Sequence, residues 1–463
     1  MTLTVTTAPA VPAVRSAPAP VPSAPAHPFL RRWRGRWPVL PLVGTVLLLA
    51  VPADGTGAGT VYGVPPADLL SGVAVLVCLG RLVFLRARPL TRAGAFVLGL
   101  PAAGLAVATV TAADPMAALP GFVRYLQIFV LVPAAVLLLV RDAHGFRIIT
   151  GSLVLLALVQ GATGAHQYAT GSGASYMGED IRAVGTFGAG DVMGMATVVG
   201  YGLLAAAAYA LRTPSGAPRW LRLGAPVTAA LLVVPLTLSF SRGAWIATAA
   251  GALTVIAAAG ARQAVRSLAV LIAAGVVLVG GFGVGSVMIS QRLTSITEVT
   301  SAPDRSVNDR YTMWAAAAGM WREQPATGVG LKGFPAHRDG HASIGLSAGS
   351  DIAGAGQDFV KQPLLSPHNM YLLVLSEQGL IGFTVLVGSW AALLVGGVRR
   401  LVLTRSRGAA AVDCGLAAVG LMTWQTVDFL YADIGGPSTV LTGIVLGLAA
   451  WWALAGPERA TAA

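Results

Sequence analysis

One histidine and several arginines are the side chains in this sequence best suited to bind an anionic group and to react beside it. His368 follows Ser366 and Pro367 and stands just before a long apolar segment. Because serine caps helices and proline suits the first helical position, the sequence predicts His368 in the first turn of a helix. The positive end of the helix dipole keeps an imidazole there neutral and able to accept a proton. A histidine that only hydrogen-bonds the helix end is the alternative, and the sequence leaves both open.

Arg242, Arg182 and Arg124 lie at or between the ends of apolar segments. Arg242 stands in a short connection between two such segments, and a charge at the rim of a bilayer is usually functional. The guanidinium group forms paired hydrogen bonds with phosphate that lysine cannot form. In the alternative interpretation, each arginine extends to lipid headgroups or pairs with an acid, such as Glu179 or Asp180 beside Arg182.

The long polar interval from 290 to 370 carries further candidates, and an interval of this length is typical of a functional loop. Asp309–Glu323 is predicted to form a helix that ends before Pro325. One face of this helix carries, at spacings of four, three and four, Arg310, Trp314, Ala317 and Trp321. The segment from Gly328 to Gly333 matches a dinucleotide-binding motif by letter only, because it follows a helix. We interpret it as a turn that can still bring Lys332 near an anion.

Composition places the chain among proteins that cross a membrane many times. Of its 463 residues 55% are hydrophobic and only 11% are charged, against about 25% charged in ordinary globular proteins. Basic residues exceed acidic ones by 12, and membrane topology explains this excess before nucleic-acid binding does. Cys78 and Cys414 lie inside apolar runs, and the histidines lack metal-ligand spacing. We therefore expect no disulfide, metal or cofactor.

The predicted fold class is an all-α polytopic membrane protein with about twelve transmembrane helices. The expected spans are Val39–Ala53, Pro66–Leu85, Gly94–Ala112, Pro120–Val140, Ile148–Tyr168, Val192–Leu211, Gly224–Phe240, Gly243–Gly260, Ser267–Ile289, Tyr371–Val398, Gly408–Leu430 and Gly435–Ala455. Residues 38–289 thus hold nine spans and 371–456 hold three, separated by the large loop 290–370. The Ala/Pro-rich tail 1–37 is expected to be disordered, and 457–463 forms a short C-terminal tail.

The positions of the basic residues orient these spans. Most of the 31 Lys and Arg residues fall in the tails and in every second connection, which the positive-inside rule assigns to the cytoplasm. Both termini are then cytoplasmic, and the large loop faces outward. Arg124, Arg182 and Arg242 are the exceptions, because this threading leaves them on the outer side.

The motifs together resemble the O-antigen ligase and O-antigen polymerase (WaaL/Wzy) superfamily. The matching segments, in the order and spacing of the family pattern, are Ser241–Gly243, Arg310–Trp314, Pro325–Phe334, His368–Leu372 and Glu377–Gly382. The resemblance covers the chain from about Arg124 onward. One segment departs from it: the family often continues Gly-Asn-Pro-Asn where this chain has Gly188 followed by Ala189, Gly190 and Asp191.

The resemblance implies a GT-C-like, metal-independent membrane glycosyltransferase that acts in polysaccharide assembly. Its donor would be a glycan on undecaprenyl diphosphate, and its acceptor a hydroxyl of another glycan or cell-surface molecule. The site would lie at the extracytoplasmic face of the cytoplasmic (inner) membrane. His368, Arg310 and Arg242 would be catalytic. Residues expected to contact diphosphate or glycan are Arg182, Arg124, Lys332, Asn369, Tyr371 and Trp314.

Two other classes remain as alternatives. A secondary transporter predicts two matching halves and ionisable groups near the midplane, and no half-repeat is visible here. A peptidoglycan-polymerase-type enzyme would also use a lipid carrier but would rely on an acidic residue in an outer loop. Ligase and polymerase share the motifs above, so the sequence leaves the acceptor open.

Overall fold

The computed structural model describes residues 37–52, 64–85, 90–176, 182–214, 217–263, 265, 305–343, 346, 350–353, 360–362, 364–406 and 411–455. Residues Pro38–Ala463 form one unit. The predicted N-terminal tail up to residue 36, the predicted ninth span Ser267–Ile289 and the C-terminal tail 457–463 lie outside the described residues.

Apolar helices dominate the described part of the chain, where nine are long and apolar enough to cross a membrane. They comprise α3 (Pro66–Leu85), α4 (Arg92–Val110), α5 (Pro115–Leu126) continued through η2 (Gln127–Leu131) into α6 (Val132–Leu139), α7 (Ala143–Thr170), α8 (Gly194–Leu211), α9 (Arg219–Leu238), α10 (Arg242–Ala259), α15 (Met370–Ser406), and η5 (Pro437–Thr439) with α17 (Val440–Leu454). Two shorter helices, α2 (Leu40–Leu48) and α16 (Val412–Asp428), correspond to predicted spans. The chain is thus a polytopic helical membrane protein, and the count of twelve spans stays a prediction.

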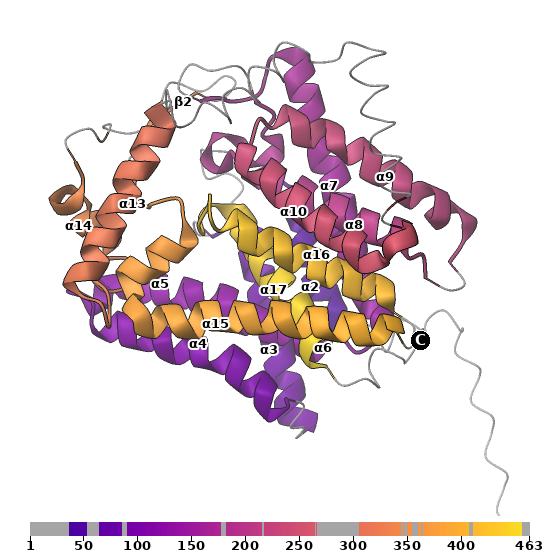
Figure 1. The fold of residues 1–463 in the computed structure, drawn as a ribbon, viewed down its shortest axis with the longest axis horizontal. Helices are drawn as coiled ribbons and strands as arrows, with labels where there is room; N and C mark the ends of the chain where they lie inside the picture. The colour runs from indigo at the N-terminus through magenta and orange to yellow at the C-terminus, as the bar shows by residue number, and fades with distance from the viewer. Residues whose placement is uncertain are drawn as a thin grey trace, which may run out of the picture. The chain divides into compact units, whose positions relative to one another are not determined.

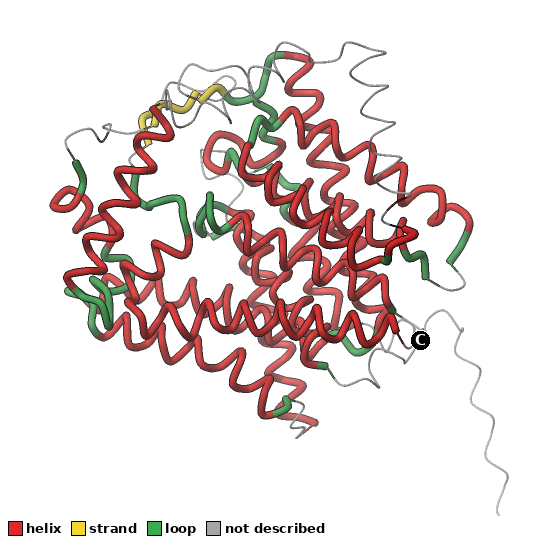
Figure 2. The backbone as a smooth tube through the Cα atoms, viewed as in Figure 1, coloured by secondary structure: helices red, strands yellow, loops and turns green. Residues whose placement is uncertain are grey.

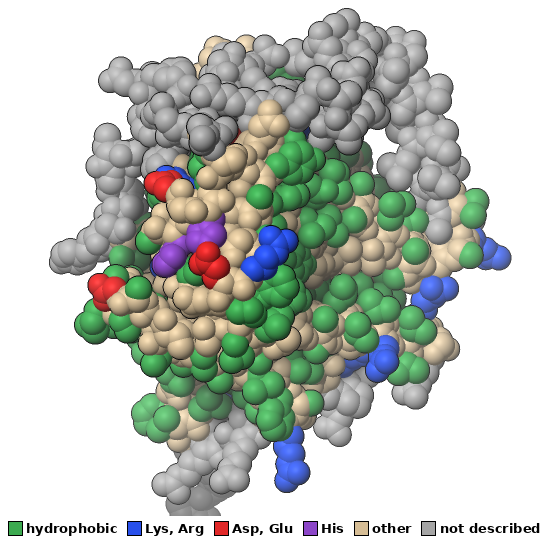
Figure 3. Space-filling model, turned by 60° about the vertical axis from the view of Figure 1, so that its left-hand side comes forward, with side chains coloured by type: hydrophobic (Ala, Val, Ile, Leu, Met, Phe, Trp, Pro, Cys, Tyr) green, Lys and Arg blue, Asp and Glu red, His purple; other side chains and the backbone are tan. Residues whose placement is uncertain are grey.

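The centre of the bundle is formed by α16 and α17, around which α6, α8, α10 and α15 pack (Figure 1). α17 contacts α6 and α15, while α16 contacts α8 and α10. Every residue of α17 from Val440 to Trp452 is buried, as expected of a helix that is apolar on all sides. By contrast α9 exposes Val227, Leu231 and Val234. Hydrophobic side chains cover most of the described helices on the face shown in Figure 3, as expected of a surface against lipid.

A break in α15 explains two of the sequence motifs together. Gly379 has φ 60° and ψ −164°, a conformation essentially restricted to glycine, in the middle of the helix. The turn that begins at Pro325 packs into this break: the Val329 N–H donates to the Ser376 carbonyl and the Leu380 N–H to the Pro325 carbonyl, both at 2.9 Å. The Glu377–Gly382 and Pro325–Phe334 segments, which are far apart in the sequence, therefore pack against each other.

The large loop contains two helices and two strands in its described part. These are α13 (Arg305–Glu323), α14 (Phe334–His341), β2 (Ser350–Ala353) and β3 (Val360–Gln362). β2 also pairs with β1 (Ser175–Tyr176), which gives a three-stranded antiparallel sheet in the order β1-β2-β3 (Figure 2). The all-α expectation therefore omitted this sheet, which joins the loop before Arg182 to the large loop.

The predicted helix in this loop is present but begins at Arg305 rather than Asp309. The side chains of this helix that are buried are Asp309, Met313, Ala316, Ala317 and Met320. Of the four residues that share the predicted face, Ala317 is therefore buried, while Trp314 and Trp321 are half-buried. The methionines fill the interface because their flexible side chains fit irregular gaps.

Candidate active site

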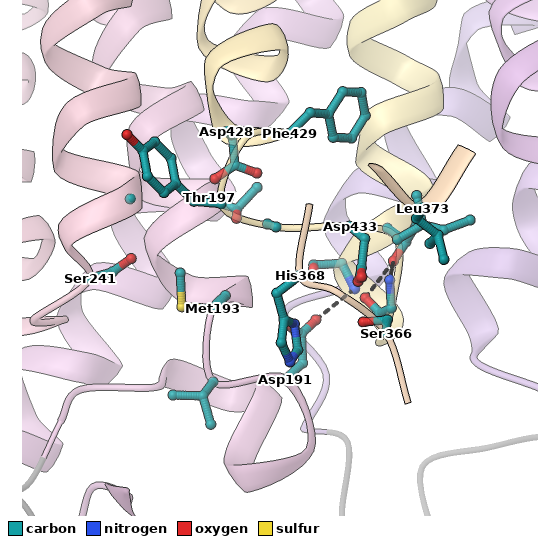
Figure 4. Close-up of a pocket in the computed structure, with 18 of the residues that line it drawn as sticks. Asp191, Met193, Thr197, Ser241, Ser366, His368, Leu373, Asp428, Phe429 and Asp433 are labelled. Carbon is teal, nitrogen blue, oxygen red and sulfur yellow. Dashed lines mark hydrogen bonds between the residues drawn. The ribbon is translucent and has the colours of Figure 1, made fainter. Parts of the chain in front are cut away.

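A cavity of about 630 Å³ lies where several helix ends meet. It is bordered by the N-terminal ends of α8, α10, α15 and α17 and by the C-terminal end of α16. Five of the nine predicted site residues line it: Arg182, Arg242, Arg310, Lys332 and His368. Figure 4 shows His368 among the side chains around this cavity.

Arg242 is the first residue of α10, and its neighbours explain the Ser-Arg-Gly motif. Ser241 caps the helix, because its Oγ accepts the Ala244 N–H at 3.2 Å. A Cβ added to Gly243 would lie 3.0 Å from the Cβ of Tyr431, so glycine lets the segment after α16 approach closely. In this motif, Ser241 caps the helix and Arg242 lines the cavity. Gly243 has no side chain and so leaves room for Tyr431 on the opposite wall.

Backbone contacts to two elements position Arg182. Its N–H donates to the Ala174 carbonyl at 2.8 Å, and its own carbonyl accepts the Ala174 N–H at 3.0 Å. The next residue, Ala183, donates to the carbonyl of Leu238 at the end of α9 at 3.1 Å. Arg182 is thereby fixed between the segment after α7 and the short connection between α9 and α10.

Arg310 lies in the second turn of α13, beside the buried Asp309 that also lines the cavity. The helix is joined to the segment of His368 by Trp314, whose indole N–H donates to the Pro367 carbonyl at 2.8 Å. Trp314 does not line the cavity itself but lies next to it, between α13 and the segment of His368.

The prediction that His368 lies in the first helical turn was wrong. α15 begins at Met370, and the residue that caps it is Asn369, whose Oδ1 accepts the Leu372 N–H at 3.0 Å. Asn369 also donates to the Leu430 carbonyl at 3.1 Å, which anchors the helix start to the end of α16. Since an asparagine two residues after Pro367 serves as the cap, Ser366 is not needed for it. His368 therefore precedes the helix, at φ 48° in the left-handed region.

The surroundings of the His368 imidazole favour its neutral form. Burial lowers the pKa of the ring, and the positive charge of Arg310 lowers it further. The negative charge of Asp433 raises the pKa, but the net pKa lies below the ordinary value. The expectation of a neutral ring thus holds, although desolvation is the main cause. A neutral imidazole that lines a cavity can accept a proton from a bound hydroxyl group.

Lys332 reaches the cavity from the turn packed against α15. It has φ 62°, and its Nζ lies 5.6 Å from the centre of the Tyr125 ring. A Cβ on Gly121 would lie only 2.5 Å from the Lys332 Cγ, so the lysine stem runs closely across α5. The interpretation of this segment as a turn that carries a lysine is consistent with its place in the lining.

Three further predicted residues lie outside the cavity lining. Arg124 pairs with Asp68 of α3 at 2.5 Å and bonds Gln127. The Tyr371 hydroxyl donates to the Thr426 carbonyl at 2.7 Å, and Asn369 caps its helix as described. The structure therefore does not bring Arg124 to the site, and it gives Tyr371 and Asn369 contacts that hold α15 against α16.

Several acidic and amide side chains that the sequence did not assign to the site also line the cavity. They are Asp191, Asp309, Glu377, Gln425, Asp428 and Asp433. Asp191 accepts the Ser438 N–H at 3.1 Å, while burial raises the pKa of its carboxyl group. The available signal was the presence of acids inside or directly beside apolar segments, since such residues are costly in a membrane. Among the residues described by the structure, no group of three or more His, Cys, Asp and Glu side chains is arranged to hold a metal ion.

Comparison with protein families identifies part of the chain. Residues 227–387 match the O-antigen ligase family model, Wzy_C. This range contains Arg242, Arg310, Lys332 and His368, together with the broken helix and the turn that packs into it. A comparison with curated proteins gives no match. The match agrees with the resemblance seen in the motifs: residues 227–387 of this polytopic membrane protein are similar to the O-antigen ligase family.

Proposed function

We propose that this chain transfers a glycan from undecaprenyl diphosphate to an acceptor hydroxyl at the outer face of the cytoplasmic membrane. The observation that carries the proposal is that Arg182, Arg242, Arg310 and His368 come from separate segments and line one cavity. Planar cations bind a diphosphate and stabilise it as a leaving group. A neutral imidazole beside them accepts the proton of an attacking hydroxyl.

The ends of the helices support an extracytoplasmic site. The cavity borders the starts of α8, α10, α15 and α17, and the opposite ends of the described helices carry many basic residues. These include Arg141, Arg147, Arg212, Arg219, Arg399 and Arg400. By the positive-inside rule those ends are cytoplasmic, so the cavity would open on the other side.

In the proposed step, the acceptor oxygen attacks the anomeric carbon and forms the new glycosidic bond with inversion. The bond between that carbon and the diphosphate oxygen breaks, and its electron pair leaves on undecaprenyl diphosphate. Arg242 and Arg310 balance the charge that develops on this oxygen, with Arg182 and Lys332 binding the remaining diphosphate oxygens. The hydroxyl proton passes to a ring nitrogen of His368. The step needs no cofactor.

The proposal is tested with the full chain in lipid nanodiscs and a lipid-linked glycan purified from bacterial membranes. His368→Ala should still bind the donor but transfer it about 10²–10⁴-fold more slowly. Arg310→Ala should lose donor binding as well. His166→Ala is the matched control, because His166 is exposed near the end of α7 and does not line the cavity. Full transfer by His368→Ala contradicts the base role, and inhibition of the wild type by EDTA contradicts a metal-free step.

The choice between ligase and polymerase is tested in a deletion strain. If the chain is a polymerase, the surface glycans of the strain become shorter. If it is a ligase, full-length chains accumulate on the lipid carrier instead.

A further inference from the structure

The cavity has a second wall whose chemistry differs from that of its arginines. We call it the polar floor, and it consists of Thr197, Tyr201, Glu377, Gln425, Asp428 and Thr442. These residues come from α8, α15, α16 and α17, and they carry hydroxyl, amide and carboxyl groups but no basic group. Glu377 is 1% and Gln425 2% exposed, so this wall lies inside the helix bundle. In Figure 4, Thr197 and Asp428 are labelled on the part of the site formed by the helices.

Contacts around Tyr201 hold part of the floor in a fixed arrangement. The Tyr201 hydroxyl donates to the Gln425 Oε1, which leaves the amide nitrogen of Gln425 as the group with hydrogens to donate. The Tyr201 ring packs edge-on against Trp424, with 4.7 Å between ring centres. The Trp424 indole N–H in turn donates to Thr248 at 2.9 Å. The hydroxyl and amide groups are thus preorganised, as in ligand sites with few precisely placed polar groups.

Glu377 offers the floor a buried acceptor. Its Oε1 accepts the Phe334 N–H at 3.2 Å, which fixes the carboxyl group beside the break in α15. Its Oε2 is buried and has no hydrogen-bond partner among the described residues. A buried oxygen without a partner is destabilising, and in a residue that lines a cavity a ligand hydroxyl can supply the missing hydrogen bond.

The floor and the arginines suit different parts of one substrate. Carboxyl oxygens accept hydrogen bonds from hydroxyl groups, whereas a phosphate carries no proton to give them and would be repelled by their charge. Vicinal hydroxyls of a sugar ring both donate and accept, which matches a wall of carboxyl, amide and hydroxyl groups. We propose that the polar floor is a sugar subsite that takes an uncharged pyranose ring of the glycan and discriminates against hexuronates. This inference rests on the proposed function, and it assigns the sugar to the floor while the diphosphate binds the arginines.

The charge selectivity follows from Glu377 and Asp428, and chiefly from Asp428, because the positive charge of Lys332 partly offsets that of Glu377 whereas Asp433 adds to that of Asp428. A hexuronate would bring its own carboxylate against these two buried carboxyl groups in a region of low dielectric. Like charges at short range cost far more there than in water, so either the ligand or the protein would have to take up a proton. A neutral hexose or an N-acetylhexosamine makes the same hydroxyl contacts without that cost.

The test uses saturation-transfer difference NMR on the full chain in nanodiscs, with methyl β-glucoside and methyl β-glucuronide as probes. Inorganic pyrophosphate is added in excess, so that the arginines of the same cavity are occupied by an anion and do not bind the glucuronide. The wild type should bind the glucoside about tenfold more tightly than the glucuronide. Asp428→Asn removes a charge without changing shape, and it should reduce that preference to about threefold or less. Thr442→Val, a second isosteric change, should weaken glucoside binding. Asp339→Asn is the charge-matched control, because Asp339 is 77% exposed on α14 and outside the lining.

Each outcome of this experiment decides the inference. Equal binding of the two probes, tighter binding of the glucuronide, or no saturable signal from either overturns it. An unchanged preference in Asp428→Asn, together with unchanged glucoside affinity in Thr442→Val, also overturns it. Arg310→Ala should keep the sugar preference while it loses the lipid-linked donor. If the wild type transfers no glycan but the sugar preference follows Asp428, the proposed function fails and the sugar subsite stands.

Discussion

The indole N–H of Trp314 donates to the carbonyl oxygen of Pro367 at 2.8 Å. Arg310 lies one turn before Trp314 on α13, and His368 directly follows Pro367. One hydrogen bond therefore holds the segments of the proposed phosphate-binding arginine and the proposed base in register. Because Trp314 itself lies outside the cavity lining, we expect it to position these groups rather than to contact substrate.

Loss of this hydrogen bond should slow transfer without abolishing it. Trp314→Phe keeps an aromatic ring but removes the donor, so we expect kcat to fall by about tenfold through misplacement of the reacting groups. The KM for the lipid-linked donor should change little. Trp321→Phe is the matched control on the same helix, because the buried Trp321 N–H has no hydrogen-bond partner among the described residues. Equal kcat values for the two variants would contradict the positioning role.

The pH dependence of transfer should reflect the lowered pKa of His368. Burial and Arg310 favour the neutral ring, so the base form persists below the usual histidine pKa of about 6.5. We expect kcat to be flat above that pH and to fall only at lower pH, as the ring takes up a proton. Stability should fall in the same window, because the unfolded chain then binds a proton that the folded chain does not. A rate profile whose acid limb has its midpoint above 6.5 would rule out this assignment.

The sign of the Asp433 contribution gives a sharper test of the same profile. The charge of Asp433 raises the pKa of His368 against the effect of burial. Asp433→Asn should therefore move the acid limb further toward low pH, whereas Asp339→Asn on the surface of α14 should leave it in place. A shift toward higher pH in Asp433→Asn would show that another group controls the limb.

The break in α15 should tolerate no side chain at Gly379. A Cβ there would lie 2.3 Å from the Ala326 carbonyl oxygen, and the backbone angles are unfavourable for other residues. Gly379→Ala should cost about 2–4 kcal/mol of stability. Gly388→Ala on the same helix meets nothing within 4 Å and should be neutral or stabilising by up to about 1 kcal/mol. Thermal unfolding in nanodiscs measures both, and comparable midpoints would refute this account of the motif.

The Arg124–Asp68 ion pair should affect folding rather than transfer. The pair joins α5 to α3 and lies outside the cavity lining. Arg124→Ala and Asp68→Ala should each destabilise the fold by about 1–3 kcal/mol, and the double variant should cost less than their sum. Transfer per folded molecule should stay near the wild-type value. A rise in donor KM for Arg124→Ala alone would return Arg124 to the substrate site.

Local sequence signals predicted the apolar helices and five of the residues that line the cavity, because each signal is local in its physical cause. A run of apolar residues that is long enough to span lipid marks a helix wherever it occurs. Arg242 and His368 stand at the ends of such runs, where a polar side chain costs free energy and so indicates a purpose. Lys332 could be assigned because the glycines around it predict a turn.

Features that depend on distant partners were not predictable in the same way. Ser366 and Asn369 are both good capping residues, and only the contact of Asn369 with Leu430 decides between them. Arg124 has no acid near it in sequence, while its partner Asp68 lies on another helix. The sheet pairs Tyr176 with Ile352, strands too short to show alternation. The polar floor joins one or two residues from each of four helices, and among them only the acids Glu377 and Asp428 stand out in the sequence.

The walls of this cavity come from segments of the chain that are synthesised at different times. Arg182 and Arg242 are translated early, whereas Gln425, Asp428 and Thr442 belong to the last two helices. A membrane chain is made from its N-terminus, and its helices assemble as they emerge. A nascent chain that stops before α16 carries the cationic residues but lacks half of the polar floor, namely Gln425, Asp428 and Thr442. The chain therefore acquires its complete pocket only when its last two helices have been made, so an incomplete chain cannot form the proposed active site.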